Sequence, residues 1–466
     1  MIAESNLNHV KKKKKRTQKR SDEPSQYSFK LAWIYGDLLT KLSLLIWGLG
    51  NIARKQIVKG VLFLSAEIGF FVFIAASGVY HLAEVPGLGT GEETRVKVDG
   101  FWVYETAKPS VEILLNGVAT VFLIFAALWF AQTAMRSAFK AQQQIVRSGK
   151  AHTIWEDLHE LTDSNSAWLF MSLPTLGILI FTVLPLVFMI SMAFTSYDSE
   201  HSKKFDWVGL DNFAVVFGNG GNVNAQLFFS VLTWTIVWAF FATFLNYFLG
   251  MFMAMIINRK TTHGKAFWRA VFSLSVAVPQ FVSLLVLRSM LQQEGIINRL
   301  LQDYGWIDSA LPFFTDANWA RVTVIIINLW IGIPYTIMQV TGILQNIPAE
   351  LYEAAKLDGA SWWQTFRNVT MPYMLFVMTP YLITTFTANV NNFNVIYLLS
   401  GGDPTPVGSS AGKTDLLITW LYKLTVDRGD YNIGAVIGIL TFIALAMVGL
   451  LTYRRSGSYR NEEGFQ

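Results

Sequence analysis

The chain has 466 residues, of which 52% are hydrophobic and only 15% are charged. Average soluble domains carry about 25% charged residues, so this composition argues against a soluble domain and favours a membrane protein. The absence of cysteine excludes a disulfide framework and a thiolate metal site. The net charge of +5 is modest, and the placement of the charges is more informative than their sum.

The N-terminal segment is basic, with a dense run of lysine and arginine from Lys11 to Arg20. Such a run is compatible with nucleic-acid binding, but in a hydrophobic chain it is more typical of a cytoplasmic tail beside anionic lipid. We therefore expect no nucleic-acid partner. The first long apolar run begins near Gly60, too far into the chain for a secretory signal.

A shorter apolar patch, Leu38 to Leu49, precedes the first long run and contains Lys41. It is too short to cross a bilayer, so we expect an interfacial helix with Trp33, Tyr35 and Trp47 at headgroup depth. Residues 1–59 are thus predicted to form a basic cytoplasmic tail that ends in an interfacial helix.

Eight later runs approach the roughly 20 apolar residues that a transmembrane helix needs. Because lipid forces each span to satisfy its own backbone groups, the predicted fold class is an all-α polytopic membrane protein with eight transmembrane helices. Several runs contain proline, which in transporters marks broken helices near substrates but is often only a kink. The runs are 60–82, 111–134, 168–194, 228–257, 270–291, 321–345, 372–392 and 432–453.

Lysine and arginine are distributed unequally between the two sides that these spans define. With the N-terminus inside, inner segments hold 26 of them and outer segments hold 9. The positive-inside rule therefore predicts a multi-pass cell-membrane protein with both termini in the cytoplasm. Residues 350–372, between the sixth and seventh spans, are predicted to be cytoplasmic as well.

Motifs for catalysis are absent from the sequence, and the six histidines are scattered. The stretch Gly408 to Thr414 resembles a phosphate-binding loop, but its glycine spacing is one residue short and it lies in a predicted external loop. We therefore interpret it as a flexible loop. We expect no enzyme activity, no catalytic residue, no cofactor and no metal site in this chain.

The inner segment from Glu353 to Pro372 reads EAAKLDGASWWQTFRNVTMP. Asp358 and Gly359 predict a bend between two short helical pieces, the first of which has a small-residue face. Three aromatic residues so close together are unusual in a cytoplasmic loop: Trp362, Trp363 and Phe366. Aromatic residues are favoured anchors in the pockets of partner proteins. The residues alone leave two interpretations open, a docking knob and a segment that packs flat on its own bundle.

Two later spans carry polar residues at helical spacing. Thr385, Asn389 and Asn392 share one face of the seventh span, and Gly332, Tyr335 and Gln339 share one face of the sixth. Intramembrane amides avoid lipid, and carboxamides suit the donors and acceptors of sugar hydroxyls. Hydrogen bonding between neighbouring helices explains the same residues without a ligand.

Glu353-Ala354-Ala355, Gly359 and Val369-Thr370-Met371-Pro372 resemble, at the same spacing, the cytoplasmic loop of binding-protein-dependent ABC importer permeases. In that family the loop docks in a cleft of the ATP-hydrolysing subunit. The resemblance implies docking by Glu353, Ala354, Ala355 and Gly359, with Asp358 and Phe366 supporting the loop. It implies a six-helix importer domain over residues 168–455, preceded by two extra helices (60–134) and a cytoplasmic linker (135–167) and followed by a tail (456–466).

From Trp168 to Tyr453 the chain is similar to MalF-type permeases of maltose and maltodextrin importers, as in Asn328-Leu-Trp-Ile-Gly332-Ile-Pro334-Tyr335 and Asn389-Val-Asn391-Asn392-Phe393. The resemblance implies a permease subunit with an ABC ATPase subunit dimer, a second MalG-type permease and an extracytoplasmic sugar-binding protein. Ala388 replaces a usual aromatic residue and Thr385 a usual serine, which puts sugar length in question. The implied sugar-binding residues are Ile331, Gly332, Tyr335, Thr385, Ala388, Asn389 and Asn392.

Two other functions are compatible with part of the sequence. An ion-coupled secondary sugar transporter needs ionisable groups within the membrane, and Glu67 in the first span is the convincing candidate. A non-transporting membrane scaffold would not need two polar helix faces. A requirement of uptake for ATP or for an ion gradient separates the first alternative from the importer.

Overall fold

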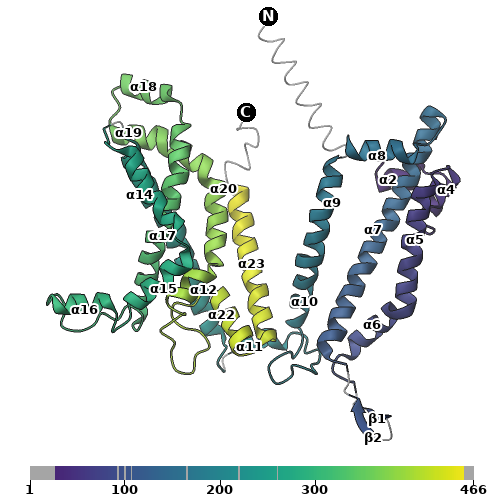
Figure 1. Ribbon diagram of the computed structural model, residues 1–466, viewed down its shortest axis with the longest axis horizontal. Helices are drawn as coiled ribbons and strands as arrows, with labels where there is room; N and C mark the ends of the chain where they lie inside the picture. The colour runs from purple at the N-terminus through teal and green to yellow at the C-terminus, as the bar shows by residue number, and fades with distance from the viewer. Residues whose placement is uncertain are drawn as a thin grey trace, which may run out of the picture. The chain divides into compact units, whose positions relative to one another are not determined.

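A computed structural model describes residues 27–455 except 92–93, 99–100, 106–107, 164–165, 219–220 and 260. The predicted basic run and the predicted C-terminal tail lie outside the described residues. The chain divides into two compact units, the first comprising Met1–Ser191 with Lys203–Trp207 and the second comprising Met192–Ser202 with Val208–Gln466. Each unit is helical, as the sequence predicts (Figure 1).

The first unit is built on two long helical segments that pack side by side. One segment consists of α5 (Ile57–Phe73), the π-helical turn η1 (Ile74–Gly78), α6 (Val79–Glu84) and the 3₁₀ turn η2 (Val85–Gly87). The other is α7 (Ser110–Ser148). A cytoplasmic-type linker helix, α8 (Ile154–Thr162), follows, and then α9 (Ser166–Ile178), η3 (Leu179–Val183) and α10 (Leu184–Met192).

An antiparallel hairpin that the sequence analysis did not anticipate joins the two long segments. Strands β1 (Thr94–Val98) and β2 (Phe101–Glu105) pair with Thr94 opposite Glu105 and Val98 opposite Phe101. Nearby, Lys203–Trp207 closes this end of the unit. The Ser110 backbone N–H donates to the Lys203 carbonyl at 2.9 Å, and the Trp207 indole donates to the Val85 carbonyl at 2.7 Å.

The predicted interfacial helix is three short helices that lie against α7: α2 (Phe29–Tyr35), α3 (Leu38–Leu42) and α4 (Leu49–Ala53). Trp33 and Tyr35 are exposed, as an interfacial position requires, but the prediction for Trp47 is wrong because its side chain is only 6% exposed. Trp47 stacks between Phe70 and Phe130, and its backbone N–H donates to Glu67 Oε2 at 2.7 Å.

The second unit begins with α11 (Asp211–Phe217) and the long fourth span, which runs through α12 (Ala225–Phe240), η4 (Phe241–Leu245) and α13 (Asn246–Asn258). Next come α14 (Lys265–Ala277), α15 (Gln280–Met290), α16 (Ile296–Asp303), the sixth span α17 (Ala317–Gln345) and α18 (Ala349–Leu357). The remaining elements are α19 (Trp362–Thr365), η5 (Phe366–Thr370), α20 (Met371–Val390), α21 (Phe393–Leu399), α22 (Leu417–Tyr422), η6 (Lys423–Asp427) and α23 (Tyr431–Arg455).

The expected fifth span, 270–291, is not one helix. It is divided into α14 (Lys265–Ala277) and α15 (Gln280–Met290), with Val278 and Pro279 both in extended conformations between them. Proline removes a backbone donor and disfavours the α conformation of the residue before it, which explains the break. The described residues therefore contain seven continuous helices long and apolar enough to span a membrane, and α15 is a shorter apolar helix.

Candidate functional site

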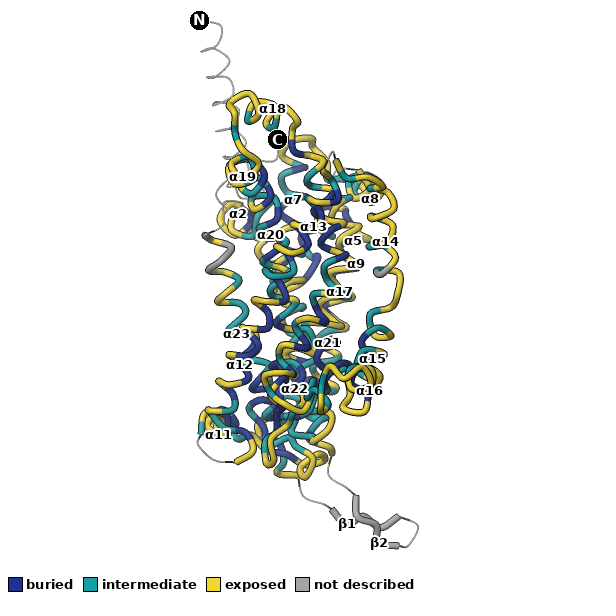
Figure 2. Tube along the Cα trace, turned by 90° about the vertical axis from the view of Figure 1, so that its left-hand side faces the viewer, coloured by how far each residue is buried: buried dark blue, intermediate teal, exposed yellow. Residues whose placement is uncertain are grey.

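The EAA segment forms an exposed knuckle of two helices at one end of the second unit (Figures 1 and 2). Helix α18 ends in a Schellman motif, in which the N–H of Ala360 donates to the Ala355 carbonyl at 2.9 Å and that of Gly359 to the Lys356 carbonyl at 3.1 Å. Gly359 has φ +71°, the left-handed conformation that glycine adopts without a Cβ penalty. Ser361 then caps α19 in a capping box with Gln364.

The side chains of the knuckle divide into an outer and an inner set. Glu353, Ala354 and Asp358 are exposed, Ala355 is half-buried, and Leu357 at the bend is 89% exposed. An apolar residue that protrudes to this extent beside small residues leaves room for the close approach of another surface. The outer set is therefore an exposed surface with one protruding apolar side chain.

The inner set attaches the knuckle to the bundle. Phe366 is half-buried and stacks on Trp362, with ring centroids 5.7 Å apart. The Arg259 guanidinium at the end of the fourth span lies 5.9 Å from the Trp362 ring, and these two residues help to line a hollow of about 200 Å³. The Tyr352 hydroxyl lies 3.1 Å from Thr370 Oγ1, which connects α18 to η5.

The fourth span lies between the two polar helices that the sequence singled out. A methyl group placed on Gly332 of α17 would lie 2.1 Å from Asn246 Nδ2 of α13. Asn389 of α20 donates from Nδ2 to Thr243 Oγ1 of η4 at 3.0 Å. Thr243 and Asn246 are three residues apart, so a single turn of the fourth span contacts both predicted polar faces.

The predicted sugar-binding residues have different surroundings. Asn392 donates to Asn389 Oδ1 at 3.3 Å and also caps α21, so these two amides are brought together. Ile331 packs on the apolar cluster that contains Trp238 and Val390. Tyr335 and Ala388 are exposed, and Thr385 is half-buried; among the described residues, no hydrogen bond joins Thr385 to the other predicted sugar-binding residues.

Sequence reasoning missed Thr243, Asn246 and Trp238 of the fourth span. The Trp238 indole donates to the Asn389 carbonyl at 3.1 Å, and Asn246 Oδ1 is buried without a hydrogen-bond partner in the described part of the chain. The available signal was an amide and a hydroxyl at i, i+3 inside an otherwise apolar run, which is costly against lipid.

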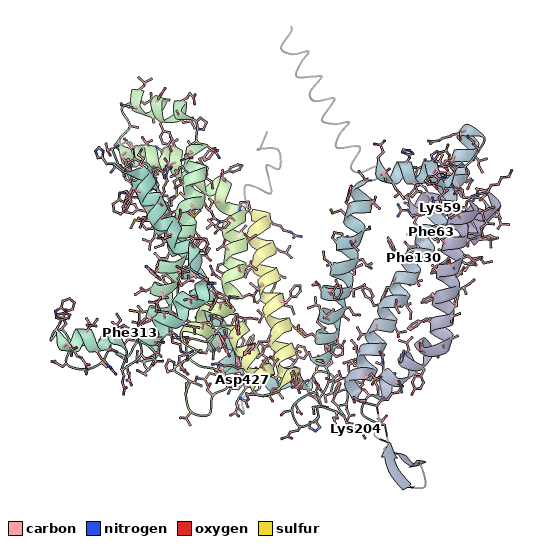
Figure 3. All side chains as sticks on the ribbon, in the orientation of Figure 1. Lys59, Phe63, Phe130, Lys204, Phe313 and Asp427 are labelled. Carbon is pink, nitrogen blue, oxygen red and sulfur yellow. The ribbon has the colours of Figure 1, made fainter. Side chains whose placement is uncertain are left out.

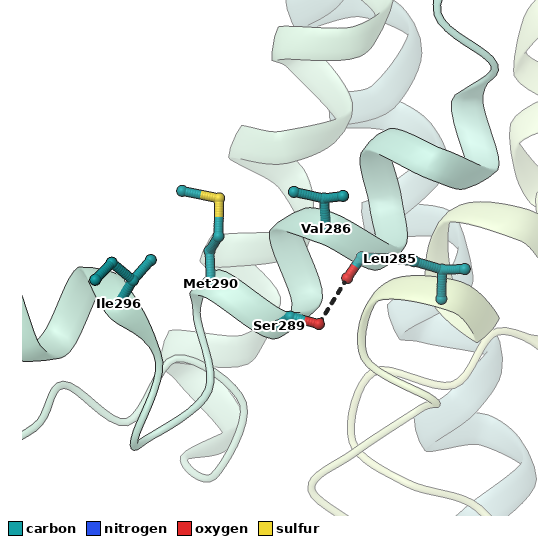
Figure 4. Close-up of a pocket in the computed structure, with 5 residues that line it drawn as sticks. All are labelled: Leu285, Val286, Ser289, Met290 and Ile296. Atoms are coloured by element: carbon teal, nitrogen blue, oxygen red, sulfur yellow. Dashed lines mark hydrogen bonds between the residues drawn. The ribbon is translucent and has the colours of Figure 1, made fainter.

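A separate hollow of about 470 Å³ lies where α15 meets α16 (Ile296–Asp303), as Figure 4 shows. Its lining is mostly apolar, and the hydroxyl of Ser289 donates to the Leu285 carbonyl at 3.1 Å. None of the predicted sugar-binding residues lines it. The lining residues are Leu285, Val286, Ser289, Met290 and Ile296.

The long apolar helices define a multi-pass membrane protein. The family described as binding-protein-dependent transport system inner membrane component matches residues 246–457. The galactooligosaccharides transport system permease protein GanP of Bacillus subtilis (strain 168) is 35% identical over 426 residues, which cover 90% of this chain and 97% of that protein. The maltodextrin transport system permease protein MdxF of the same organism is 33% identical over 431 residues, covering 90% and 95%.

A crystal structure of a bacterial ABC transporter involved in the import of alginate has a similar fold. Its matching chain gives a TM-score of 0.52 at 20% identity and covers 65% of this chain and 97% of that one. This chain belongs to the family of inner membrane components of binding-protein-dependent transport systems. It is a transport component rather than a catalytic enzyme.

Proposed function

We propose that this chain is the permease subunit of an ABC importer that carries maltodextrin-type oligosaccharides across the cell membrane. ATP hydrolysis takes place on a separate ATPase subunit dimer, which docks at the knuckle formed by α18 and α19. A second, MalG-type permease and an extracytoplasmic sugar-binding protein complete the assembly. Both termini and the knuckle lie in the cytoplasm.

The observation that best supports this proposal is that one continuous helix connects the knuckle to the polar face of the seventh span. Helices α19, η5 and α20 follow one another without a break from Trp362 to Val390. At 1.5 Å per residue this rod is about 40 Å long. Its first turn carries the aromatic anchors of the knuckle, and its last turns carry Thr385, Ala388 and Asn389. A displacement of the knuckle is thereby delivered to the proposed sugar residues.

The relatives support the substrate class. GanP is a galactooligosaccharide permease by name, whereas MdxF and the MalC protein of Streptococcus pneumoniae are maltodextrin permeases. The amides of Asn389 and Asn392 suit sugar hydroxyls of either substrate. Ala388 offers no ring on which a sugar could stack, so hydrogen bonds from the amides and the exposed Tyr335 ring carry more of the recognition.

Docking at the knuckle is tested by Gly359→Asp in a strain that lacks the native permease. The left-handed φ and the added carboxylate both disturb the Schellman bend, so we expect maltotriose uptake to fall to background while membrane insertion is kept. Gly149→Asp is the matched control, since Gly149 also has a positive φ (+76°) and open surroundings. Normal uptake by Gly359→Asp would remove the docking role.

The sugar site is tested by Asn389→Leu, for which we expect loss of maltotriose uptake and of sugar-stimulated ATPase activity in the reconstituted complex. Thr243→Val removes the same interhelical hydrogen bond without removing the amide, and we expect it to keep most of the transport. If Thr243→Val is as inactive as Asn389→Leu, the amide acts only in helix packing and the proposed site is wrong.

A further inference from the structure

The short helices α2 to α4 present lysines among exposed apolar residues. In α2, Lys30 is exposed one turn before Trp33 and Ile34, which are 53% and 52% exposed. In α3, Lys41 is exposed one turn after Leu38, which is 73% exposed, and Leu45, which is 72% exposed, lies in the turn that follows α3. The same arrangement thus occurs twice, on two separate helices.

The charge of this segment is unbalanced. Asp37 is the only carboxylate between residues 27 and 58, and it is occupied by Arg54 Nη2 at 2.6 Å. Farther along, Lys59 pairs with Asp157 and Lys140 pairs with Glu160. Lys30 and Lys41 have no such ion pair among the described residues, so their positive charges are uncompensated within that part of the chain.

The contacts of the segment with α7 fix its depth along that helix. Trp47 packs on Ala127, Ala131 and Ala134, which are the last turns of the apolar run. Thr40, next to Lys41, donates to Gln142 Oε1 at 2.9 Å. Ala134 and Gln142 are eight residues apart, so Lys41 lies about 12 Å beyond the end of the apolar run.

Figure 3 shows Lys59 and Lys204 near opposite ends of the first unit, with Phe130 between them. In a bilayer that covers the apolar run of α7, the turn at Leu45 would lie beside acyl chains and the Lys41 ammonium beside headgroups. Long lysine side chains reach such a level with their stems on apolar surface.

We propose that α2 to α4 form a binding platform for anionic phospholipids. The ammonium groups of Lys30 and Lys41 contact the lipid phosphates, while Trp33, Leu38 and Leu45 lie against glycerol and acyl chains. Amphipathic segments with this composition lie in the interface plane, and an anionic leaflet attracts each basic residue near its surface. This assigns a role to a segment that precedes the transport domain and is independent of the sugar carried.

The test is native mass spectrometry of the full chain titrated with phosphatidylglycerol or phosphatidylcholine in detergent. A basic residue near an anionic surface contributes about fivefold to the association constant, so Lys30→Gln with Lys41→Gln should weaken phosphatidylglycerol binding by roughly 25-fold. Phosphatidylcholine binding should not change, which also reports that the variant is folded. The matched control is Lys203→Gln with Lys413→Gln, two exposed lysines elsewhere, for which we expect no change.

Equal losses in the platform and control variants would show that net charge alone attracts the lipid and would overturn the proposal. Unchanged phosphatidylglycerol binding in the platform variant would overturn it as well, as would equal affinity of the natural chain for the two lipids. A second variant, Leu45→Gln, should weaken the binding of both lipids, since it removes apolar contact and no charge. Unaltered binding of both by Leu45→Gln would refute the placement of the turn at acyl depth.

Discussion

The close crossing of the fourth and sixth spans makes a strong prediction at Gly332. Alanine at this position would place its methyl group 2.1 Å from Asn246 Nδ2 and 2.9 Å from Asn246 Cγ. Carbon and nitrogen atoms do not approach to these distances, so Asn246 must rotate or α13 must move away from α17. The contact recurs one turn along, where a methyl group on Gly250 would lie 2.5 Å from Thr336 Cβ.

The size of the effect follows from two opposing contributions. Replacing glycine by alanine inside a helix stabilises it by roughly 0.5–1 kcal/mol. Overpacking a well-packed contact costs about 1–3 kcal/mol. The net expectation for Gly332→Ala therefore ranges from almost no change to a destabilisation of about 2.5 kcal/mol. Gly342→Ala lies in the same helix with no atom within 4 Å, so only the favourable contribution applies there.

The assay is the apparent thermal midpoint of the purified chain, measured at one scan rate for all variants. A difference of about 2 kcal/mol between Gly332→Ala and Gly342→Ala corresponds to roughly 4–8 °C for a unit of this size. Adding Asn246→Ala to Gly332→Ala should recover most of the loss, because it empties the space that the methyl group needs. Equal midpoints for the two glycine variants, or a double variant no better than Gly332→Ala, would refute the steric explanation.

Three further substitutions test other parts of the molecule. Lys423→Met removes the cation 2.7 Å from the fully buried Asp415 carboxylate and should cost about 3–5 kcal/mol at neutral pH. Burial raises the pKa of the Asp415 carboxyl and Lys423 opposes that rise, so the Asp415 pKa is higher still in the Lys423→Met variant. The variant should therefore be most stable at low pH and should lose stability as the pH rises above the pKa that Asp415 has in the unfolded chain. A loss of stability that is equal from pH 4 to 8 would contradict this. Tyr352→Phe removes one hydrogen bond to the buried Thr370 and should destabilise the protein by about 0.5–1.5 kcal/mol. It should also lower sugar-stimulated ATPase activity. Unchanged ATPase activity would show that η5 does not need this hydrogen bond to α18. Glu67→Gln should leave sugar uptake intact, since an amide oxygen also accepts a hydrogen bond from the Trp47 N–H. Loss of uptake in a folded Glu67→Gln protein would instead favour the ion-coupled alternative.

Features that depend on a few neighbouring residues were predictable from the sequence. The bend of the knuckle is an example, because its left-handed glycine, its Schellman hydrogen bonds and its capping serine all lie between Ala355 and Gln364. The helical class and most spans were predictable for the same reason, since an apolar run that is long enough must form a helix in lipid.

Features that depend on backbone direction or distant partners were missed. The run 270–291 is apolar on average, and mean hydropathy does not register that Pro279 breaks the helix. The Asp99-Gly100 pair flanked by alternating residues was a hairpin signal that the search for long apolar runs passed over. Trp47 reads as an interfacial aromatic until its contacts with Phe70 and Phe130, more than twenty residues away, are known.

The fourth span shows a different limit. Its apolar residues lie on all sides, so hydrophobic periodicity does not identify the face turned toward α17 and α20, and the spacing of Thr243 and Asn246 was the available signal. Only the structure places Thr243 and Asn246 on one turn between them.

That turn also unites the two interpretations of the polar residues, helix packing and sugar binding. The Asn389 amide donates to Thr243, and a hydrogen bond between neutral groups contributes only about 0.5–1.5 kcal/mol net. A sugar hydroxyl offers the same amide a bond of similar strength, so exchange between the two partners needs little free energy. Under the proposed function, a movement of the knuckle would act through the continuous helix from Trp362 to Val390 and would change the separation of Asn389 from Thr243. In the proposed mechanism, the Asn389 amide would hold the helices together in one state and would bind sugar in the other, so that one residue would serve both packing and transport.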